Sequence, residues 1–462
     1  MKYFSTKDKN YTVSFRTAVM KGLAKDGGLF MPAEIPLLYP LNLPARSADA
    51  SLPDSRRDRG EPGQSGTDSI ISKTENYSLQ EIGYEIAKNF VGDEIPEQDL
   101  LTIIESAINF PAPLVQLSDQ LYVLELFHGP TLAFKDFGAR FMAKTMGYFA
   151  KGFDKELNIL VATSGDTGSA VAHGFYGADG VRVFLLYPEG KVSFIQEQQL
   201  TTLDKNITAL EIKGTFDDCQ RLVKEAFVDK TLNQKLNLSS ANSINIARLI
   251  PQSFYYVNAY RQIKEKTKPV VVSVPSGNLG NLTAGLFAKK MGLPIEKFIG
   301  ATNKNNVFTE FLNTAQFKPR KSVLTLSNAM DVGNPSNLER IVELYNGNIE
   351  KIRSDVSSFS YSDEATKEGI KEVFEKYNYT LDPHGAVGYK ALKDFIELHT
   401  IKNVNCVVVE TAHPAKFKNV VEETIGKEIE IPERLAACIN KEKKTIRLNS
   451  DFASLKEFLI NA

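Results

Sequence analysis

The chain has 462 residues, with 55 Lys and Arg against 56 Asp and Glu, so its formal net charge is −1. Hydrophobic residues make up 42% and charged residues 24%, the composition of a globular protein rather than of a disordered or fibrous one. At roughly 150 residues per domain, this length predicts two or three domains. Because the charges balance and no basic stripe is present, nucleic acid is disfavoured as a partner.

The chain has three cysteines, Cys219, Cys406 and Cys438, and none of them shows CxxC spacing. This pattern indicates neither a disulfide framework nor a thiolate metal site. The five histidines form no HxxH or HExxH pattern, so we predict no metal. The first residues lack the apolar segment of a signal peptide, and no run of about 18 apolar residues occurs. We therefore expect a cytoplasmic protein without a membrane segment.

The N-terminal region, residues 1–110, is predicted to be helical, with helices at 14–25, 79–90 and 97–109. Between the first two of these helices, residues of about 41–77 are rich in Ser, Asp, Arg, Pro and Gly and have no period of 3.6 or 2. Such a segment cannot bury enough apolar area to offset its ordering entropy. We interpret it as a flexible surface insertion, a linker in preference to a docking tail.

From residue 111 onward, short β-branched runs alternate with helical patterns. This alternation predicts an α/β fold with mostly parallel sheets wound on both faces, which bind ligands at the carboxyl ends of their strands. The predicted strands are 121–126, 157–163, 181–187, 207–212, 270–274, 298–302 and 404–411, and the predicted helices are 136–150, 168–176, 217–230, 246–264 and 279–291.

The clearest ligand signal follows the strand at 270–274. The strand leads into a Ser-Gly-Asn-Leu-Gly-Asn turn at 276–281 and then into a helix, so glycine backbone can approach a ligand while free N–H groups point at an anion. Phosphate fits such a turn. The Lys-Ser/Thr pair of a Walker site and GxGxxG spacing are both missing, which disfavours nucleoside triphosphates and dinucleotides. A purely structural strand–helix connection stays open for this turn.

Two further features extend this pattern. A Ser-Gly-Asp-Thr-Gly turn at 164–168 gathers hydroxyl and N–H groups at a helix start, which suits a carboxylate. Lys135 stands at another helix start between Phe134 and Phe137, where the helix dipole is unfavourable and apolar neighbours lower the pKa of an amine. A lysine that forms a Schiff base needs such a setting, although an ordinary solvated lysine is the simpler interpretation of this window alone.

Together, an imine-forming lysine, a phosphate turn and a carboxylate turn describe an amino-acid enzyme that uses pyridoxal phosphate. The segments that carry these features resemble those of the threonine synthases, a pyridoxal-phosphate family with a tryptophan-synthase-β-like fold, and the resemblance covers nearly the whole chain in order. The similar segments are 26–29, 127–137, 163–168, 242–245, 277–281, 327–337, 382–386 and 410–417.

The resemblance implies roles for particular residues. Lys135 would carry the cofactor as a Schiff base, and Thr411 would face its pyridine nitrogen with a hydroxyl group. The family's substrate is O-phosphohomoserine, whose phosphate needs its own cations, although each of the cationic candidates could equally be a surface charge. The cofactor phosphate would be bound by Gly277, Asn278, Leu279, Gly280 and Asn281, the substrate carboxylate or the cofactor's phenolic oxygen by Ser164, Asp166 and Thr167, and the substrate phosphate by Arg248, Lys304 and Lys416.

The same resemblance implies two α/β lobes with the cofactor in the cleft between them, a smaller one at about 125–235 and a larger one at about 236–462. The expected reaction converts O-phospho-L-homoserine and water to L-threonine and phosphate, in a monomer or a dimer. Two alternatives remain: a lyase of the same fold that makes 2-oxobutyrate, and a binding module without catalysis. For His128, His384 and His413 we predict structural hydrogen bonds rather than proton transfer.

Overall fold

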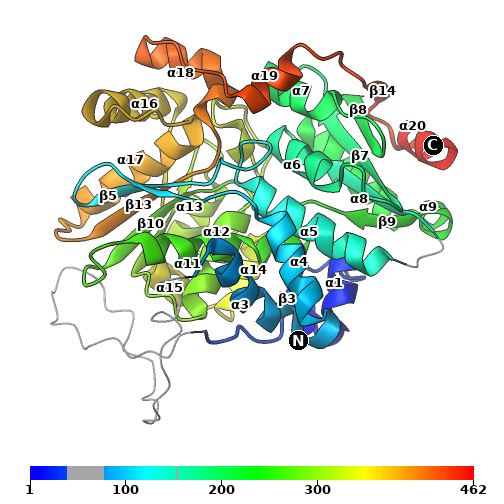
Figure 1. The fold of residues 1–462 in the computed structure, drawn as a ribbon, viewed down its shortest axis with the longest axis horizontal. Coiled ribbons are helices and arrows are strands. Elements are labelled where there is room, and N and C mark those ends of the chain that lie inside the picture. The colour runs from blue at the N-terminus through cyan, green and yellow to red at the C-terminus, as the bar shows by residue number, and fades with distance from the viewer. Residues whose placement is uncertain (39–76, 152–154) are drawn as a thin grey trace.

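The computed structural model describes residues 1–38, 77–151 and 155–462. Its described part holds a six-stranded sheet, a five-stranded sheet and a small three-stranded sheet, with helices packed around them (Figure 1). The predicted insertion at about 41–77 lies almost entirely outside the described residues. No helix in the described ranges is long and apolar enough to cross a membrane.

The N-terminal region contains a three-stranded sheet that the sequence analysis did not predict. Its order is β2-β1-β3, and both pairings are antiparallel. The predicted helix at 14–25 ends at Lys21, because Gly22 takes a positive φ of 69° and closes the last turn. The elements here are β1 (Lys2–Ser5), β2 (Asp8–Ser14), α1 (Phe15–Lys21), β3 (Phe30–Pro32), α3 (Leu79–Val91), η1 (Gly92–Glu94) and α4 (Glu97–Ala107).

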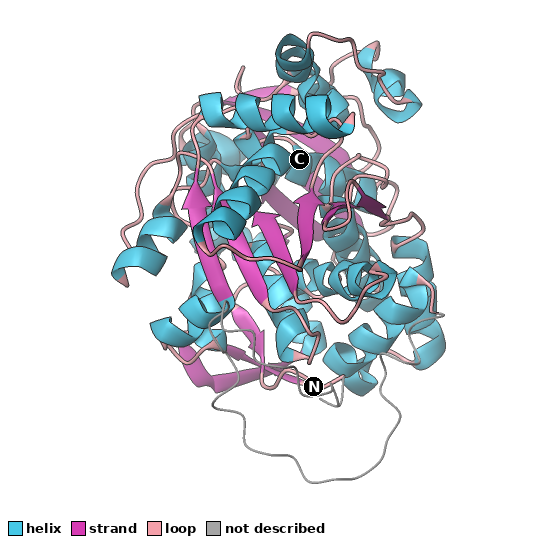
Figure 2. Cartoon of the chain, turned by 90° about the vertical axis from the view of Figure 1, so that its left-hand side faces the viewer, coloured by secondary structure: helices cyan, strands magenta, loops and turns pink. Residues whose placement is uncertain are grey.

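The six-stranded sheet has the order β12-β11-β10-β13-β5-β4, and every pairing except β4 with β5 is parallel. Figure 2 shows its strands side by side. Its elements are β4 (Leu114–Gln116), β5 (Leu121–Glu125), β10 (Val270–Pro275), α12 (Gly280–Lys290), β11 (Lys297–Thr302), α13 (Val307–Thr314), η2 (Asn328–Met330), α14 (Leu338–Leu344), α15 (Ile349–Asp355), β12 (Val356–Ser360), α16 (Asp363–Tyr377), α17 (Pro383–Leu398), β13 (Asn405–Glu410), η3 (Pro414–Phe417), α18 (Lys418–Ile425) and α19 (Glu433–Ile439).

Both faces of this sheet are covered, as the continuous apolar runs predict. Val272 and Val274 of β10 pack with helices α11 and α12 on one face, while Val271 joins the cluster of α16 and α17 on the other. Because side chains alternate along a strand, a strand with helices on both faces has to be apolar at every position.

The five-stranded sheet is entirely parallel and has the order β14-β8-β7-β6-β9. Ile159 of β6 faces α6, and its neighbour Leu160 faces α8 and α20. The elements are α5 (Lys135–Ala150), β6 (Leu157–Ala162), α6 (Asp166–Phe175), β7 (Val181–Pro188), α7 (Phe194–Thr201), β8 (Ile207–Lys213), α8 (Phe216–Val228), α9 (Lys230–Lys235), β9 (Asn237–Ser240), α10 (Ile246–Leu249), α11 (Gln252–Gln262), β14 (Ile446–Asn449) and α20 (Phe452–Asn461).

The strands predicted in the sequence match β5, β6, β7, β8, β10, β11 and β13 within two residues at each end. Two expectations differ from the structure. The helix predicted at 246–264 is divided into α10 and α11, because Pro251 has no N–H group to continue the first helix. The smaller sheet extends beyond 125–235, because the short, polar strands β9 and β14 form its two edges.

The C-terminal helix therefore belongs to the smaller lobe, and this placement can be tested by mutation. Leu455 of α20 is fully buried in the cluster that covers β6 and β7. We expect Leu455→Ala to lower the free energy of unfolding by about 2 to 5 kcal/mol, because the truncation removes buried methyl groups and leaves a cavity. Leu398→Ala is the control, because Leu398 is 69% exposed at the end of α17 and should cost little. Urea unfolding measures both, and equal effects would contradict the placement.

Candidate functional site

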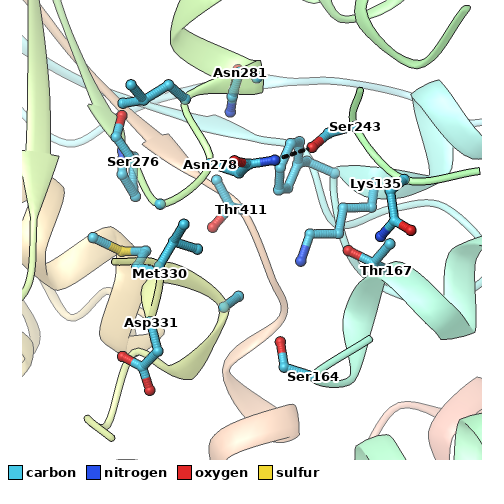
Figure 3. A pocket seen from close by; sticks show the side chains of 18 of the residues that line it. Lys135, Ser164, Thr167, Ser243, Ser276, Asn278, Asn281, Met330, Asp331 and Thr411 are labelled. Carbon is cyan, nitrogen blue, oxygen red and sulfur yellow. Dashed lines mark hydrogen bonds between the residues drawn. The ribbon is translucent and has the colours of Figure 1, made fainter. Parts of the chain in front are cut away.

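A pocket lies where β6, β10 and β13 reach their carboxyl ends, so both large sheets contribute to its wall (Figure 3). Turns that follow parallel strands converge at such an edge, which is the usual ligand position in α/β folds. The residues that line the pocket and figure in the sequence analysis are Lys135, Ser164, Thr167, Arg248, Gly277, Asn278, Leu279, Gly280, Asn281, His384 and Thr411.

Lys135 is the first residue of α5, and its amine points into the pocket (Figure 3). Burial lowers the pKa of its amine to about 8; Asp166 opposes this shift, and the nearby cations Lys416 and Arg248 add to it. A substantial fraction of the amine is therefore neutral near pH 8, and a neutral amine can act as a nucleophile or a base. This agrees with the sequence argument that apolar surroundings would lower the pKa.

The turn at 277–281 forms the opposite wall. Gly277 approaches the segment around η2 so closely that a Cβ atom there would lie 2.7 Å from Met330 Cα. Leu279 has a left-handed φ of 61°, and α12 begins at the next residue. The first N–H groups of a helix have no intrahelical acceptors and attract an anion.

Asn281 completes this wall. Its Oδ1 accepts hydrogen bonds from the hydroxyl groups of Tyr255, at 2.5 Å, and Tyr256, at 2.6 Å. These two bonds fix the amide, so that its Nδ2 is the donor left over. Among the described residues this buried Nδ2 has no partner, and Asn281 lines the pocket. A buried donor without a partner costs free energy, and an anion at the start of α12 would satisfy it.

Thr411 follows β13 and closes the pocket from a third side. The backbone N–H of Phe134 donates to the Thr411 carbonyl at 2.9 Å, so the segment that carries Lys135 is fixed to the end of β13. Ser164 and Thr167 belong to the turn after β6, where the Thr163 hydroxyl accepts from the N–H groups of two glycines. These two side chains line the pocket as predicted.

Three of the predicted contacts do not line the pocket. Asp166 lies behind the wall, where its carboxylate accepts from Gln196 at 2.8 Å and pairs with Lys416 at 2.6 Å. Lys416 is fully buried, and its ion-pair partner is Asp166. Lys304 is 44% exposed and lies 3.5 Å from Asp363. Of the three cations predicted for the substrate phosphate, the structure brings Arg248 alone to the pocket.

The histidines have the structural hydrogen bonds that we predicted. His384 Nδ1 lies 2.6 Å from Asp382, and its Nε2 accepts from the backbone of Ala329 at 3.2 Å. His413 Nδ1 accepts from the N–H of Ala415 at the start of η3, and His128 pairs with a carboxylate on β5.

Comparison with known proteins identifies the family. Family models described as "Threonine synthase N terminus", "Pyridoxal-phosphate dependent enzyme" and "Threonine synthase, C-terminal" match residues 2–47, 106–412 and 385–459. Threonine synthase from Escherichia coli is 42% identical over the full length of both chains, and that from Saccharomyces cerevisiae is 36% identical over 92% of this chain and 89% of the yeast one. The chain belongs to the threonine synthase family.

Solved structures agree. The E. coli threonine synthase superposes with a TM-score of 0.88 over both complete chains, at 42% identity. The pyridoxal-phosphate-bound enzyme of Brucella melitensis does so with a TM-score of 0.86, at 33% identity, over 100% of this chain and 99% of its own. A tomato threonine deaminase, at 18% identity and a TM-score of 0.52, shares the fold alone.

The residues of the pocket fit the family's cofactor. Pyridoxal phosphate needs an amine for its aldehyde and donors for its phosphate. Lys135 supplies a buried amine of lowered pKa, and the orphaned Asn281 Nδ2 at the start of α12 supplies a donor without a competing protein acceptor. The cofactor and the enzyme class predicted from the sequence are confirmed by the family.

The sequence analysis missed several residues of the pocket wall. Asp331 lies in a segment that was recognised as family-like but given no role, and burial raises the pKa of its carboxyl to about 6. Phe216 and Gln220 come from α8, the helix that follows β8 in the chain. No motif marks these two, because an amphipathic helix pattern does not show which of its residues reach another lobe.

We call the turn at 277–281 the phosphate wall, because it is the predicted site of the cofactor phosphate. The closeness of Gly277 to η2 gives a first test of this wall. Gly277→Ala should weaken the binding of pyridoxal phosphate at least tenfold, because the added methyl group meets Met330 backbone and must displace the turn. Gly147→Ala is the matched control, since a Cβ there, within α5, has no neighbour within 4 Å. The measurement is an absorption titration of the apoenzyme with the cofactor. Equal affinities in the two variants would contradict the role of this wall.

The partly buried His173 of α6 predicts an acid-sensitive stability. Burial lowers the pKa of its imidazole from 6.5 to about 4, so between these values the unfolded chain binds more protons than the folded one. Stability therefore falls as the pH drops from about 6.5 to about 4. We expect His173→Gln to remove on the order of 3 kcal/mol of this loss. Urea unfolding at pH 7 and pH 4.5 measures it, with the exposed His399→Gln as a control that keeps the full loss.

Proposed function

We propose that the protein converts O-phospho-L-homoserine and water to L-threonine and phosphate. Its family membership supports the reaction, and one structural observation carries it. A buried lysine amine of lowered pKa faces a phosphate wall and a threonine hydroxyl across one pocket. The relatives that support this assignment align with this chain over their whole length.

When bound, pyridoxal phosphate withdraws electrons from the α-carbon of an amino acid and acidifies its protons. Lys135 would hold the cofactor through its Nζ, and the same Nζ, when it is free, would be the base that accepts the substrate's Cα proton. The N–H groups of Gly277, Asn278, Leu279, Gly280 and Asn281 hold the cofactor phosphate without adding formal charge.

Thr411 would offer its hydroxyl group to the pyridine nitrogen of the bound cofactor. A hydroxyl group there can accept or donate a hydrogen bond but carries no charge, so it does not hold a proton on the ring as a carboxylate would. A less electron-demanding ring favours a reaction in which the electrons move on to expel a group at Cγ. The neighbouring carboxyl, Glu410, does not line the pocket, and burial next to Asp382 raises its pKa well above the ordinary value.

The substrate's two anions are assigned to two walls. Ser164 and Thr167, with the start of α6, bind the carboxylate. Arg248 binds the phosphate: burial lowers the pKa of its guanidinium to about 10, so it stays charged at neutral pH, and it lines the pocket. Lys304 and Lys416 have carboxylate partners away from the pocket wall and are not part of this proposal. The cytoplasm remains the predicted location.

The product distinguishes this function from that of a same-fold lyase. The purified protein, supplied with pyridoxal phosphate and O-phosphohomoserine, should release threonine and phosphate in equal amounts, as measured by amino-acid analysis and a phosphate assay. Formation of 2-oxobutyrate without threonine would contradict the proposal and favour the lyase.

The lysine can be tested by absorption. Lys135→Ala should lose the visible absorption that borohydride removes from the unaltered protein, because among the described residues Lys135 is the lysine that lines the pocket. Activity should fall by a factor of 1,000 or more, on the order expected when a nucleophile and base is removed. Lys144→Ala is the matched control, since Lys144 is exposed on the same helix. If Lys135→Ala kept the reducible absorption, the assignment would fail.

A further inference from the structure

A buried ion pair behind the pocket joins the two lobes. Asp166 is the first residue of α6, which covers the smaller sheet, and Lys416 lies in η3, which follows a strand of the larger sheet. Their charged atoms are 2.6 Å apart, and the two side chains are 3% and 0% exposed. Lys416 Nζ also donates to the Thr131 carbonyl at 3.0 Å. A charge pair taken so completely out of water persists only when both partners are present and hydrogen-bonded.

The pair adjoins the segment that carries Lys135, because Lys416 donates to the Thr131 carbonyl and Thr131 donates twice to Asp136, the residue after Lys135. Three charged groups act on the Lys135 amine: Asp166 from α6, Lys416 from η3 and Arg248 from α10. Of the remaining titratable groups around the amine, Asp136 is bound twice by Thr131, His173 faces Lys416 from α6, and Asp331 and His384 line the far wall of the pocket. Asp166 is thus the anion that would stabilise the ammonium form of Lys135.

Two cations compete for this one carboxylate. Although burial alone would raise the pKa of Asp166, the charges of Lys416 and Lys135 hold it well below the ordinary value, so the carboxylate is ionised. The Asp166 carboxylate contacts Lys416 and Gln196 rather than Lys135. An opposite charge that is already neutralised stabilises a second ammonium ion much less than a free one does.

We propose that Lys416 is a positioning residue: by pairing with Asp166 it keeps this carboxylate from binding the Lys135 amine, so that the amine can lose its proton. Lys416 itself does not contact the substrate. The inference rests on the proposed role of Lys135. It replaces the substrate contact that the sequence suggested for Asp166 and Lys416 with an action through the charge of the lysine.

The test measures the ionisation of Lys135 directly in the full-length apoenzyme. Trace acetic anhydride acylates only neutral amines, so the rate of Lys135 acetylation as a function of pH, read by peptide mass spectrometry, follows its titration. The variants are Lys416→Met, Asp166→Asn, the two combined, and Lys416→Arg. Lys367→Met is the control, because Lys367 pairs with an exposed carboxylate at the surface.

Lys416→Met should slow acetylation of Lys135 at pH 7 at least tenfold, because Asp166 is freed to bind the lysine and a repelling charge is lost. Asp166→Asn should speed it about fivefold, the change that a one-unit fall from a pKa near 8 gives. The combined variant, which leaves no unpaired charge, should lie between Asp166→Asn and the unaltered protein. Lys416→Arg and Lys367→Met should titrate as the unaltered protein does.

Identical titration of Lys135 in Lys416→Met and in the unaltered protein would overturn the inference. So would a rise in the KM for O-phosphohomoserine in Lys416→Met with no change in the titration, because that result would mark a substrate contact. If a single variant does not fold, the combined variant decides, since a titration of Lys135 outside the expected interval contradicts the proposal. Acetylation needs no turnover, so a protein that makes no threonine but shows these shifts refutes the proposed function and leaves this inference intact.

Discussion

The amine of Lys135 has to be buried next to other cations, and much of the surrounding structure follows from this constraint. A lysine in water is an ammonium ion and cannot attack an aldehyde or accept a proton. Removing it from water disfavours the charge, and the repulsion from Lys416 and Arg248 works in the same direction. The free-energy cost of burying the amine is offset by contacts of the segments that enclose it. These are the hydrogen bond from the Phe134 N–H to the Thr411 carbonyl after β13 and the packing of α5 against α6.

The anions of the site are handled by a different principle. The formal net charge of −1 gives no hint of a pocket for two phosphates and a carboxylate. Neutral donors suit the cofactor phosphate, because the start of α12 and the fixed amide of Asn281 offer N–H groups to an anion without adding a cation that would further disfavour the ammonium form of Lys135. An arginine or lysine in place of the glycine turn would bind phosphate well but would change the titration of the Lys135 amine. The glycine turn therefore serves two requirements at once.

Much of this arrangement follows from local sequence. Continuous apolar runs such as that of β10, followed by Gly and Asn, give both a strand buried on two faces and the turn at its end, so the parallel sheets and the phosphate wall were predictable. The N-terminal strands were not, because residues 8–14 (Asp-Lys-Asn-Tyr-Thr-Val-Ser) are mostly polar and exposed, and only Tyr11 and Val13 are partly buried. Strand β14 was not predictable either, because almost all of its four residues are exposed. Its position in the sheet depends on α20, which packs behind it.

The Asp166–Lys416 pair shows the limit of such reasoning most clearly. Each residue stands in a motif that belongs to the site, and local sequence gives no sign that they neutralise one another across 250 residues. The reason is topological. After β13 the chain passes Thr411 at the pocket and Lys416 behind its wall, and then returns through α19, which packs on α7, to add β14 to the smaller sheet. A rotation of the smaller lobe against the larger one would have to bend this returning segment or stretch the buried pair. The buried pair and the returning segment therefore both connect the smaller lobe to the larger one behind the pocket.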